Sequence, residues 1–434
     1  MLILSGATIL SLVLLLHSAI SADRYTRTFI YLAIGFIVFF YMLPLWTAEA
    51  VGSLKFAGVF FRFDSAEIAS ASLAMLVFCA GFAIANWFLS SRTVVGAAAG
   101  KAVIQRNRPG FEALSFSVVL LLAIYSYWTG QYENVIAIRR EEADASHVFA
   151  TMLIACYYLG CFFVLRALGK NKIIKASIWT ILCLLISINF VGRAFILLLI
   201  SLPILHYIKT PGLAISAIAT SFYILLPFIV SGKELIYAIM NGNDFFGIAI
   251  DAYYSSSKIA DVFGGVSHAL ISYINAPTLI EKFGGYRWFW DIPQGFIFYL
   301  RLLGFNIEDS LTYYNTESLV QIRQSIIPPG YLAFGYIQAG MAGVLMSGMI
   351  FRFLGWWVGL LRAKFQGDSL SADFFFAFLA ANSFYIGEPR SMVLTLLFPC
   401  LVIYFIILFS QTFAPNTQPR LLRESTMWRN KSAN

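Results

Sequence analysis

Blocks of about twenty consecutive apolar residues recur along this chain and constrain its fold more than any other feature. A helix of that length crosses the hydrocarbon core of a bilayer, which is about 30 Å thick. The blocks from Phe29 to Trp46 and from Ser391 to Phe413 contain no charged residue. Only 12% of all residues are charged, whereas soluble domains carry about 25% because their surfaces face water. The sequence therefore predicts an all-α polytopic membrane protein.

The apolar blocks predict about eleven transmembrane helices. Their expected positions are residues 3–20, 28–46, 68–89, 112–130, 148–168, 176–191, 194–208, 213–231, 331–352, 374–387 and 391–412. Lys and Arg concentrate in the loops that this assignment makes cytoplasmic, which predicts an external N-terminus and a cytoplasmic C-terminus. The net charge of +8 follows from this bias and gives no indication of nucleic-acid binding. No basic residue precedes the first apolar block, so we expect a retained span and no cleaved signal peptide.

The predicted topology divides the chain into four parts. Residues 1–231 form the first part of the transmembrane bundle, 232–330 a large external loop, 331–412 the last part of the bundle, and 413–434 a basic cytoplasmic tail. The loop is far longer than a connection requires and is rich in aromatic and aliphatic residues. Two stretches in it, Ile248–Ile274 and Trp288–Leu303, are typical of amphipathic interfacial helices. We expect a partly helical cap on the outer membrane face, with an extra span or a re-entrant segment as the alternative.

Metal and disulfide chemistry are not expected. The five cysteines all lie inside apolar blocks, where they are predicted to be buried small side chains. Glu142 and Asp144 have the acidic–x–acidic spacing that can hold a divalent cation. The neighbouring Arg139 and Arg140 would repel that cation. The sequence predicts no metal and no other cofactor.

The predicted spans are nearly free of charge, which favours a working site at the outer interface over a central pore. Arg139 and Arg140 face the outside between the fourth and fifth spans, against the positive-inside tendency. Guanidinium groups bind phosphate oxygens in a bidentate manner, and a pair of them suits a pyrophosphate. A solvated loop with local Arg–Glu pairs is the alternative. Arg193 follows Gly192 in a turn between two short spans, where it is placed for either membrane anchoring or phosphate contact.

The long loop and the last external turn supply the remaining candidate residues. Those expected to contact substrate are Arg287, Arg301, Tyr314, Asn315, Arg323 and Arg390. His268, Glu142 and Glu317 are candidate proton acceptors; for His268, a packed interfacial side chain is the alternative. In the turn Gly387-Glu-Pro-Arg390, the acid and the arginine are placed to pair. Pro328-Pro-Gly330 precedes a Gly-rich helix entrance, which suits either close helix packing or the approach of a ligand.

The chain resembles the oligosaccharide repeat-unit polymerases of the Wzy type, which include O-antigen and capsule polymerases. The resemblance lies in two arginine-rich regions predicted to be external and in short sequence motifs. Three of the motifs lie around the longer region: Ile271-Ser-Tyr-Ile-Asn-Ala-Pro277, Tyr314-Asn-Thr316, and Pro328-Pro-Gly330 before a Gly-rich span. The Gly-Arg turn at 192–193, between two short spans, also fits.

The resemblance implies a glycosyltransferase at the periplasmic face of the bacterial inner membrane, with a GT-C-like fold similar to that of the O-antigen ligases. Such enzymes transfer a growing glycan from one undecaprenyl pyrophosphate to the sugar of another lipid-linked repeat unit, without a metal. The implied partners are undecaprenyl-pyrophosphate-linked oligosaccharide, the lipid bilayer and a chain-length regulator protein. On this basis Arg139, Arg140, Arg193 and Arg323 would bind the pyrophosphates, and His268 or an acid of the loop would be the base.

Three other functions fit parts of the pattern. An O-antigen ligase uses the same lipid donor with a different acceptor, and the sequence separates it poorly from a polymerase. A flippase for lipid-linked oligosaccharide predicts charges lining a central cavity and a pseudo-repeat, and the sequence indicates neither. A membrane-bound acyltransferase predicts a histidine deep in a span, for which His17 is a poor candidate.

Overall fold

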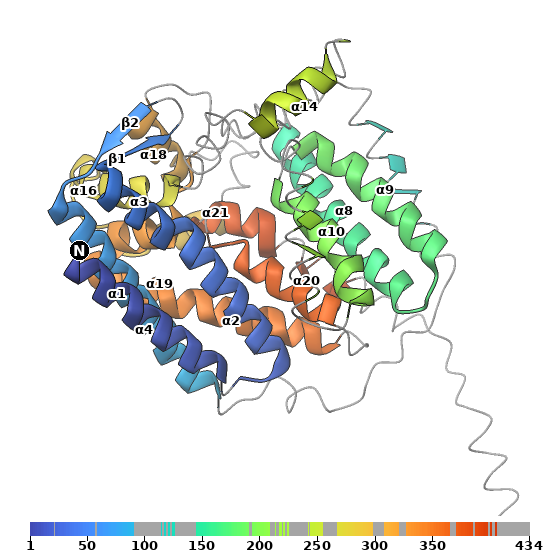
Figure 1. The fold of residues 1–434 in the computed structure, drawn as a ribbon, viewed down its shortest axis with the longest axis horizontal. Helices are drawn as coiled ribbons and strands as arrows, with labels where there is room; N and C mark the ends of the chain where they lie inside the picture. The colour runs from blue at the N-terminus through green and yellow to red at the C-terminus, as the bar shows by residue number, and fades with distance from the viewer. Residues whose placement is uncertain are drawn as a thin grey trace, which may run out of the picture.

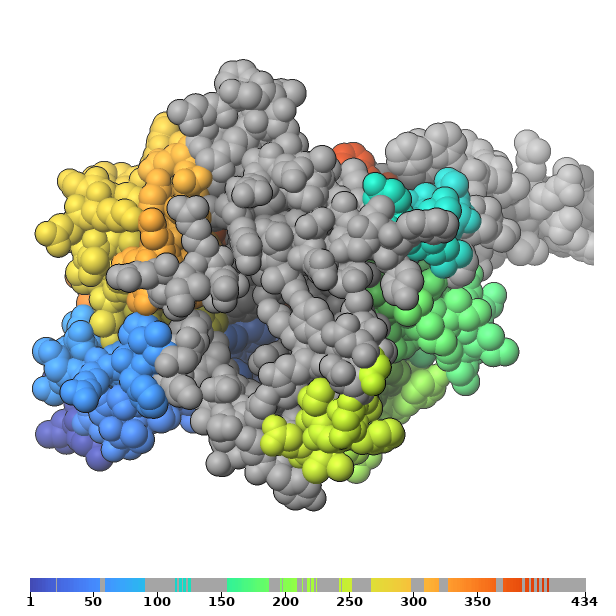
Figure 2. Space-filling view, turned by 90° about the horizontal axis from the view of Figure 1, so that it is seen from above, coloured from blue at the N-terminus to red at the C-terminus, as the bar shows by residue number. Residues whose placement is uncertain are grey.

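The computed structural model describes most of the N-terminal third of the bundle and most of the external loop (Figure 1). The described residues are 1–20, 22–56, 59–90, 145–190, 193–208, 244–254, 267–297, 308–320, 327–364, 370–384 and 387–397, together with isolated positions elsewhere up to 405. The N-terminal helices and the loop segments 267–297 and 308–320 lie on one side of the molecule, and residues 154–208 lie on the other (Figure 2).

The described chain is predominantly helical, with one small β-hairpin. Its elements are α1 (Leu2–Ile20), α2 (Arg24–Ile37), η1 (Val38–Met42), α3 (Leu43–Val51), β1 (Ser53–Phe56), β2 (Val59–Arg62), α4 (Ser65–Ser90), α8 (Ala145–Leu168), α9 (Ile173–Phe190), α10 (Arg193–Tyr207), α14 (Phe245–Tyr254), α16 (His268–Lys282), α17 (Asp291–Ile297), α18 (Leu311–Val320), α19 (Gly330–Lys364), α20 (Leu370–Ala381), α21 (Pro389–Met392) and η3 (Val393–Leu397).

The prediction of a helical membrane protein is confirmed. Among the described residues, four helices are long and apolar enough to cross a bilayer: Leu2–Ile20, Arg24–Val51, Ser65–Leu89 and Gly330–Ala363. Shorter apolar helices coincide with the predicted spans near 148–168, 176–191, 194–208 and 374–387. The span Arg24–Val51 contains the π-helical turn η1 immediately before Pro44, and such a turn accommodates a proline, which has no backbone N–H to donate. The total of about eleven spans stays a prediction.

Helix α19 packs against α4 with their backbones in contact. A Cβ atom on Gly81 of α4 would lie 2.0 Å from the carbonyl oxygen of Leu345, and a Cβ on Gly348 of α19 would lie 2.1 Å from the carbonyl oxygen of Phe78. No side chain fits at either position. Small residues at such crossings let membrane helices approach closely enough for continuous van der Waals contact.

Aromatic rings fill the space around this crossing. The rings of Phe29 and Phe351 have centroids 5.4 Å apart, and those of Phe351 and Phe384 are 5.2 Å apart. Tyr331 lies 5.2 Å from the Phe351 ring. All four side chains are fully buried, so helices α2, α19 and α20 share one core.

Helix α19 is interrupted at Ala339 and Gly340. Gly340 has φ 59° and ψ −143°, which departs from helical geometry and which glycine adopts without a Cβ clash. Beyond the break, a Cβ on Gly343 would lie 2.0 Å from the carbonyl oxygen of Gly335. In a continuous helix, residues eight positions apart are about 12 Å apart along the axis. Residues 330–338 therefore fold back on the following segment, unlike the uninterrupted span predicted at 331–352.

The two ends of the bundle carry different polar contacts. At one end, the N-terminal amine lies 2.9 Å from Glu49 Oε1, and the hairpin β1–β2 connects α3 to α4 with Ser53 opposite Arg62. The sequence patterns did not predict this hairpin. At the other end, Asp373 accepts a hydrogen bond from Arg362 Nε at 2.7 Å, and its second carboxylate oxygen forms an ion pair with Arg24 Nε at 2.7 Å. The predicted topology makes the first end external and the second cytoplasmic.

Replacing Gly348 by Ala should destabilise the protein, because the new methyl group meets the α4 backbone, which cannot move aside as a flexible side chain can. We expect a loss of about 1–3 kcal/mol, typical of an overpacked core. The measurement is the thermal unfolding of the purified protein in detergent.

The matched control is Gly35→Ala in α2, where nothing lies within 4 Å of the added Cβ. This change should leave the unfolding temperature unaltered or raise it, because alanine favours a helix by up to about 1 kcal/mol over glycine. Equal unfolding temperatures for the two variants would contradict backbone contact at Gly348.

Candidate functional site

Asn315 of α18 forms hydrogen bonds to three segments of the chain. Its Nδ2 donates to Ser272 Oγ at 2.8 Å and to the carbonyl oxygen of Ile327 at 2.9 Å, and its Oδ1 accepts from Asn275 Nδ2 at 3.2 Å. The neighbouring Thr316 Oγ1 accepts from the backbone N–H of Ile327 at 2.8 Å. Asn315 is fully buried. Its hydrogen bonds fix α16, α18 and the segment that leads into Pro328-Pro-Gly330.

A buried carboxylate lies beside this network. Glu388 is 2% exposed and accepts a hydrogen bond from the hydroxyl group of Thr312. The turn that carries it is closely packed: Gly387 has φ 62°, and a Cβ there would lie 2.1 Å from the carbonyl carbon of Gly330. Two glycines therefore let the 387–389 turn touch the start of α19. Burying a carboxylate is costly unless it is hydrogen-bonded, so this position is a candidate for function.

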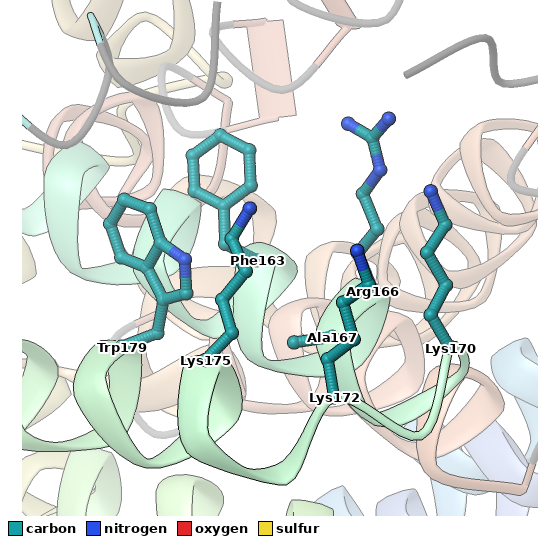
Figure 3. A pocket seen from close by; sticks show the side chains of 7 residues that line it. All are labelled: Phe163, Arg166, Ala167, Lys170, Lys172, Lys175 and Trp179. Atoms are coloured by element: carbon teal, nitrogen blue, oxygen red, sulfur yellow. The ribbon is translucent and has the colours of Figure 1, made fainter. Parts of the chain in front are cut away.

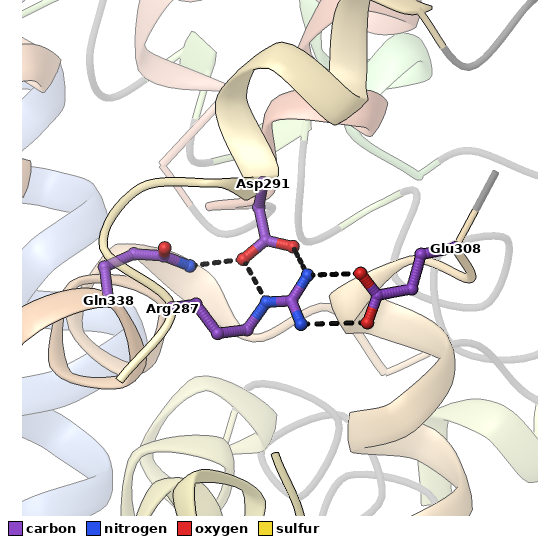
Figure 4. A network of polar contacts seen from close by, with 4 residues as sticks. All are labelled: Arg287, Asp291, Glu308 and Gln338. Carbon is purple, nitrogen blue, oxygen red and sulfur yellow. Dashed lines mark hydrogen bonds and ion pairs between the residues drawn. The ribbon is translucent and has the colours of Figure 1, made fainter. Parts of the chain in front are cut away.

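Arg287 forms the centre of a second polar group (Figure 4). Its Nε and Nη2 donate to the two oxygens of Asp291, and its Nη1 and Nη2 donate to the two oxygens of Glu308, all at 2.9 Å. Gln338 Nε2 donates to Asp291 Oδ2 at 2.5 Å. The guanidinium also lies 4.6 Å from the ring centroid of Phe283. We call Arg287, Asp291, Glu308 and Gln338 the arginine clamp.

The clamp places one cation between two carboxylates. Burial lowers the pKa of Arg287, but the hydrogen bonds and charges of Glu308 and Asp291 outweigh burial and raise that pKa above its ordinary value. Four of the five guanidinium donors point at these two carboxylates, whose summed charge of −2 exceeds that of the arginine. The geometry therefore gives Arg287 a structural role. Pyrophosphate binding by Arg287 stays a prediction.

An aromatic turn adjoins the clamp. Trp288 and Phe289 have positive φ values of 50° and 62°, and such values cost a bulky residue about 1–2 kcal/mol. Tyr286, Trp288 and Trp290 are 44%, 74% and 56% exposed. The backbone N–H groups of Arg287 and Trp288 donate to the last carbonyl oxygens before the break in α19, at 3.2 and 2.9 Å. The strained backbone of this turn therefore coincides with a group of exposed aromatic side chains.

His268 begins α16 and faces the bundle. It is buried, and its ring meets the Phe40 ring edge-on at 5.6 Å. Tyr273, one turn further on, contacts Ser70 Oγ at 3.1 Å. Burial raises the pKa of Tyr273 to about 12, so its hydroxyl stays protonated at neutral pH. This face of α16 is a packing surface on α4 and η1.

Tyr314 and Glu317 lie on the outer side of α18. The Tyr314 ring packs edge-on against Phe283 at 5.1 Å, and Lys282 Nζ lies 5.2 Å from its centroid. Glu317 is exposed and pairs with Lys282 at 2.8 Å.

The remaining predicted site residues are arginines and one acid in other parts of the chain. Arg139, Arg140, Glu142, Arg301 and Arg323 lie outside the described residues. Arg193 begins α10 and Arg390 lies in α21, but their side chains are not described. Within the described ranges, no group of three His, Cys, Asp or Glu side chains converges as metal ligands would.

The structure thus adds Glu388 and Thr312 to the candidate site. The sequence signal for Glu388 was the turn Gly-Glu-Pro, whose acid was expected to pair with Arg390. Helix α17, next to the clamp, packs against α21, which follows Glu388 directly. The clamp, the aromatic turn and the buried carboxylate consequently lie in one region at the predicted external end.

Replacing Arg287 by Ala should destabilise the external loop, because two partly buried carboxylates would lose their shared cation. Removing one partner of a buried ion pair costs about 3–5 kcal/mol, and Glu308 is 35% exposed, so we expect the lower end of that range. Thermal unfolding and the rate of limited proteolysis within 267–320 would measure the effect.

The matched control is Lys282→Ala, which breaks the exposed pair with Glu317 and should cost less than about 1 kcal/mol. An Arg287→Ala protein that is as stable and as protease-resistant as the control would contradict the structural role.

Comparison with known proteins identifies no relative. No protein-family model, no curated protein and no solved structure matches this chain.

Proposed function

We propose that this membrane protein polymerises undecaprenyl-pyrophosphate-linked oligosaccharide repeat units at the periplasmic face of the inner membrane. The observation that carries the proposal is the buried carboxylate of Glu388, held by Thr312 in the predicted external region of the bundle. Glycosyl transfer to a sugar hydroxyl needs a group that accepts the hydroxyl proton, and carboxylates serve this role in many enzymes.

The proposed reaction is a displacement at the anomeric carbon of the donor glycan. The acceptor hydroxyl forms a new C–O bond to that carbon, and the bond to the pyrophosphate oxygen breaks with its electron pair leaving on the pyrophosphate. The hydroxyl proton passes to Glu388. Positive charge at the interface would stabilise the leaving pyrophosphate; Arg139, Arg140, Arg193 and Arg323 remain the residues predicted to supply it.

Glu388 is a stronger candidate base than Glu317 and His268, the two predicted candidates that lie among the described residues. Glu317 is exposed and paired with Lys282, and His268 packs against Phe40. Glu388 is buried, accepts from the Thr312 hydroxyl, and lies in a turn packed closely against Gly330. A positioned base of this kind contributes a rate factor of about 10²–10⁴.

The aromatic turn supports a glycan substrate. Aromatic faces are large, rigid and apolar with polar edges, which suits the C–H faces and hydroxyl groups of sugar rings. The exposed rings of Tyr286 and Trp288 lie 6.1 Å apart beside the clamp. A strained turn that presents them is typical of a binding element.

Glu388→Gln should abolish polymer formation while the protein still folds, because glutamine keeps the shape and can still accept from Thr312 but cannot take a proton. The measurement is a surface-polysaccharide gel from a strain lacking the gene, complemented with each variant. We expect wild type to restore a ladder and Glu388→Gln to leave a single repeat unit, with both proteins at equal level in the membrane.

Glu281→Gln is the matched control, since Glu281 is an exposed acid of α16, and it should give a normal ladder. A full ladder from Glu388→Gln would sink the assignment of the base. If the deletion strain instead accumulates polymer on the lipid carrier without transfer to its final anchor, the protein is a ligase. An unchanged ladder in the deletion strain would rule out both enzymes.

Trp288→Gly should lower polymer output without lowering stability. Glycine relieves the positive φ at this position but removes a ring that is 74% exposed. Removing the backbone strain should stabilise the folded protein by about 1–2 kcal/mol. The greater conformational entropy of glycine in the unfolded chain offsets about 0.5–1 kcal/mol of this gain. Ladder length and thermal unfolding are measured together, with the exposed Trp87→Ala in α4 as control. A stable variant with a normal ladder would show that this ring does not contact glycan.

A further inference from the structure

A pocket lies between α8 and α9 at the turn that joins them, remote in sequence from the candidate site (Figure 3). Its apolar part is formed by Phe163, Ala167 and Trp179. The Phe163 and Trp179 rings stack with centroids 4.6 Å apart and planes 27° apart. The turn is tight, because the backbone N–H groups of residues 170 and 172 both donate to the carbonyl oxygen of Ala167, at 3.1 and 2.9 Å.

Four cationic side chains complete the pocket: Arg166, Lys170, Lys172 and Lys175. Figure 3 shows that they extend to the same side of the helix pair. The sequence from 145 to 190 contains no Asp or Glu, so the hairpin itself supplies no opposite charge. Burial lowers the pKa of Lys170, and the charges of Arg166 and Lys172 lower it further. Four cations that converge on one pocket are the chemistry that binds phosphate oxygens.

The exposed apolar face of α9 indicates that the pocket lies at the boundary between the membrane core and the headgroups. Ile174, Ile178, Ile181 and Leu185 recur at helical spacing and are 80%, 44%, 57% and 49% exposed. In a membrane protein, such a stripe faces lipid acyl chains. The cations lie at the end of that stripe, where phospholipid headgroups lie. The three lysines also make this turn cytoplasmic by the positive-inside rule, and that leaflet carries anionic lipid.

We propose that the pocket between α8 and α9 binds the phosphate of an anionic phospholipid headgroup in the cytoplasmic leaflet. The four cations would contact the phosphate oxygens. The acyl chains would run along the exposed stripe of α9. A zwitterionic lipid carries a compensating amine and should bind less tightly. This site is independent of glycan polymerisation.

Native mass spectrometry of the purified full-length protein tests the proposal. The protein is titrated with phosphatidylglycerol, with phosphatidylcholine, or with inorganic phosphate. We expect phosphatidylglycerol to bind about tenfold more tightly than phosphatidylcholine. Lys170→Gln/Lys172→Gln should weaken phosphatidylglycerol binding about 25-fold, since each of the two cations near an anionic headgroup contributes about a factor of five. Lys170→Arg/Lys172→Arg should retain it.

The control variant is Arg27→Gln/Lys282→Gln, which removes two exposed cations elsewhere and should bind phosphatidylglycerol as wild type does. Thermal unfolding without lipid checks that every variant is folded. Equal affinity for the two lipids, or no loss in the Lys170/Lys172 variant, overturns the proposal. Inorganic phosphate that displaces phosphatidylglycerol at equal concentration would identify a free-phosphate site and overturn the lipid assignment.

Discussion

Backbone contact between α4 and α19 is the constraint on which the rest of the described structure depends. At Gly81 and Gly348 the two helices meet with no side chain between them, so their separation cannot change without breaking the contact. Membrane helices gain little from hydrophobic burial, because lipid is as apolar as their side chains. Close packing therefore has to stabilise the bundle. It also fixes Phe78 and Phe351, whose rings are 6.1 Å apart, and with them the start of α19.

The break at Gly340 lets the start of α19 bind the 284–290 turn through its backbone. Because residues 330–338 fold back, their last carbonyl oxygens face the 284–290 turn and accept from Arg287 and Trp288. These two main-chain bonds and the clamp hold the turn from both sides. The energetic cost of positive φ at Trp288 and Phe289 is offset by contacts that no alternative backbone would keep. A strained aromatic surface is thus fixed relative to the bundle and does not move as a loose loop would.

Hydropathy was enough to predict α1, α4 and α8, because each is one uninterrupted apolar run with charges at its ends. It could not locate the break in α19, since a Gly-rich sequence fits either a continuous close-packed helix or a reversal. Hydropathy also could not predict which charged residues are buried. Arg352 lies at the edge of an apolar run, yet it is 2% exposed and donates to Asn86. That partner is 266 positions away, and no local pattern encodes it.

The candidate site escaped motif analysis for the same reason. Its carboxylate is in the turn before α21, its hydroxyl partner opens α18, and the backbone that both approach begins α19. Thr312 and Glu388 are 76 positions apart, so their meeting depends on Asn315 fixing the segment before α19 and on Gly387 allowing contact with Gly330. An exposed acid such as Glu317 needs no such support, because water solvates it at little cost. The support that surrounds Glu388 is the physical reason to assign the chemistry to it.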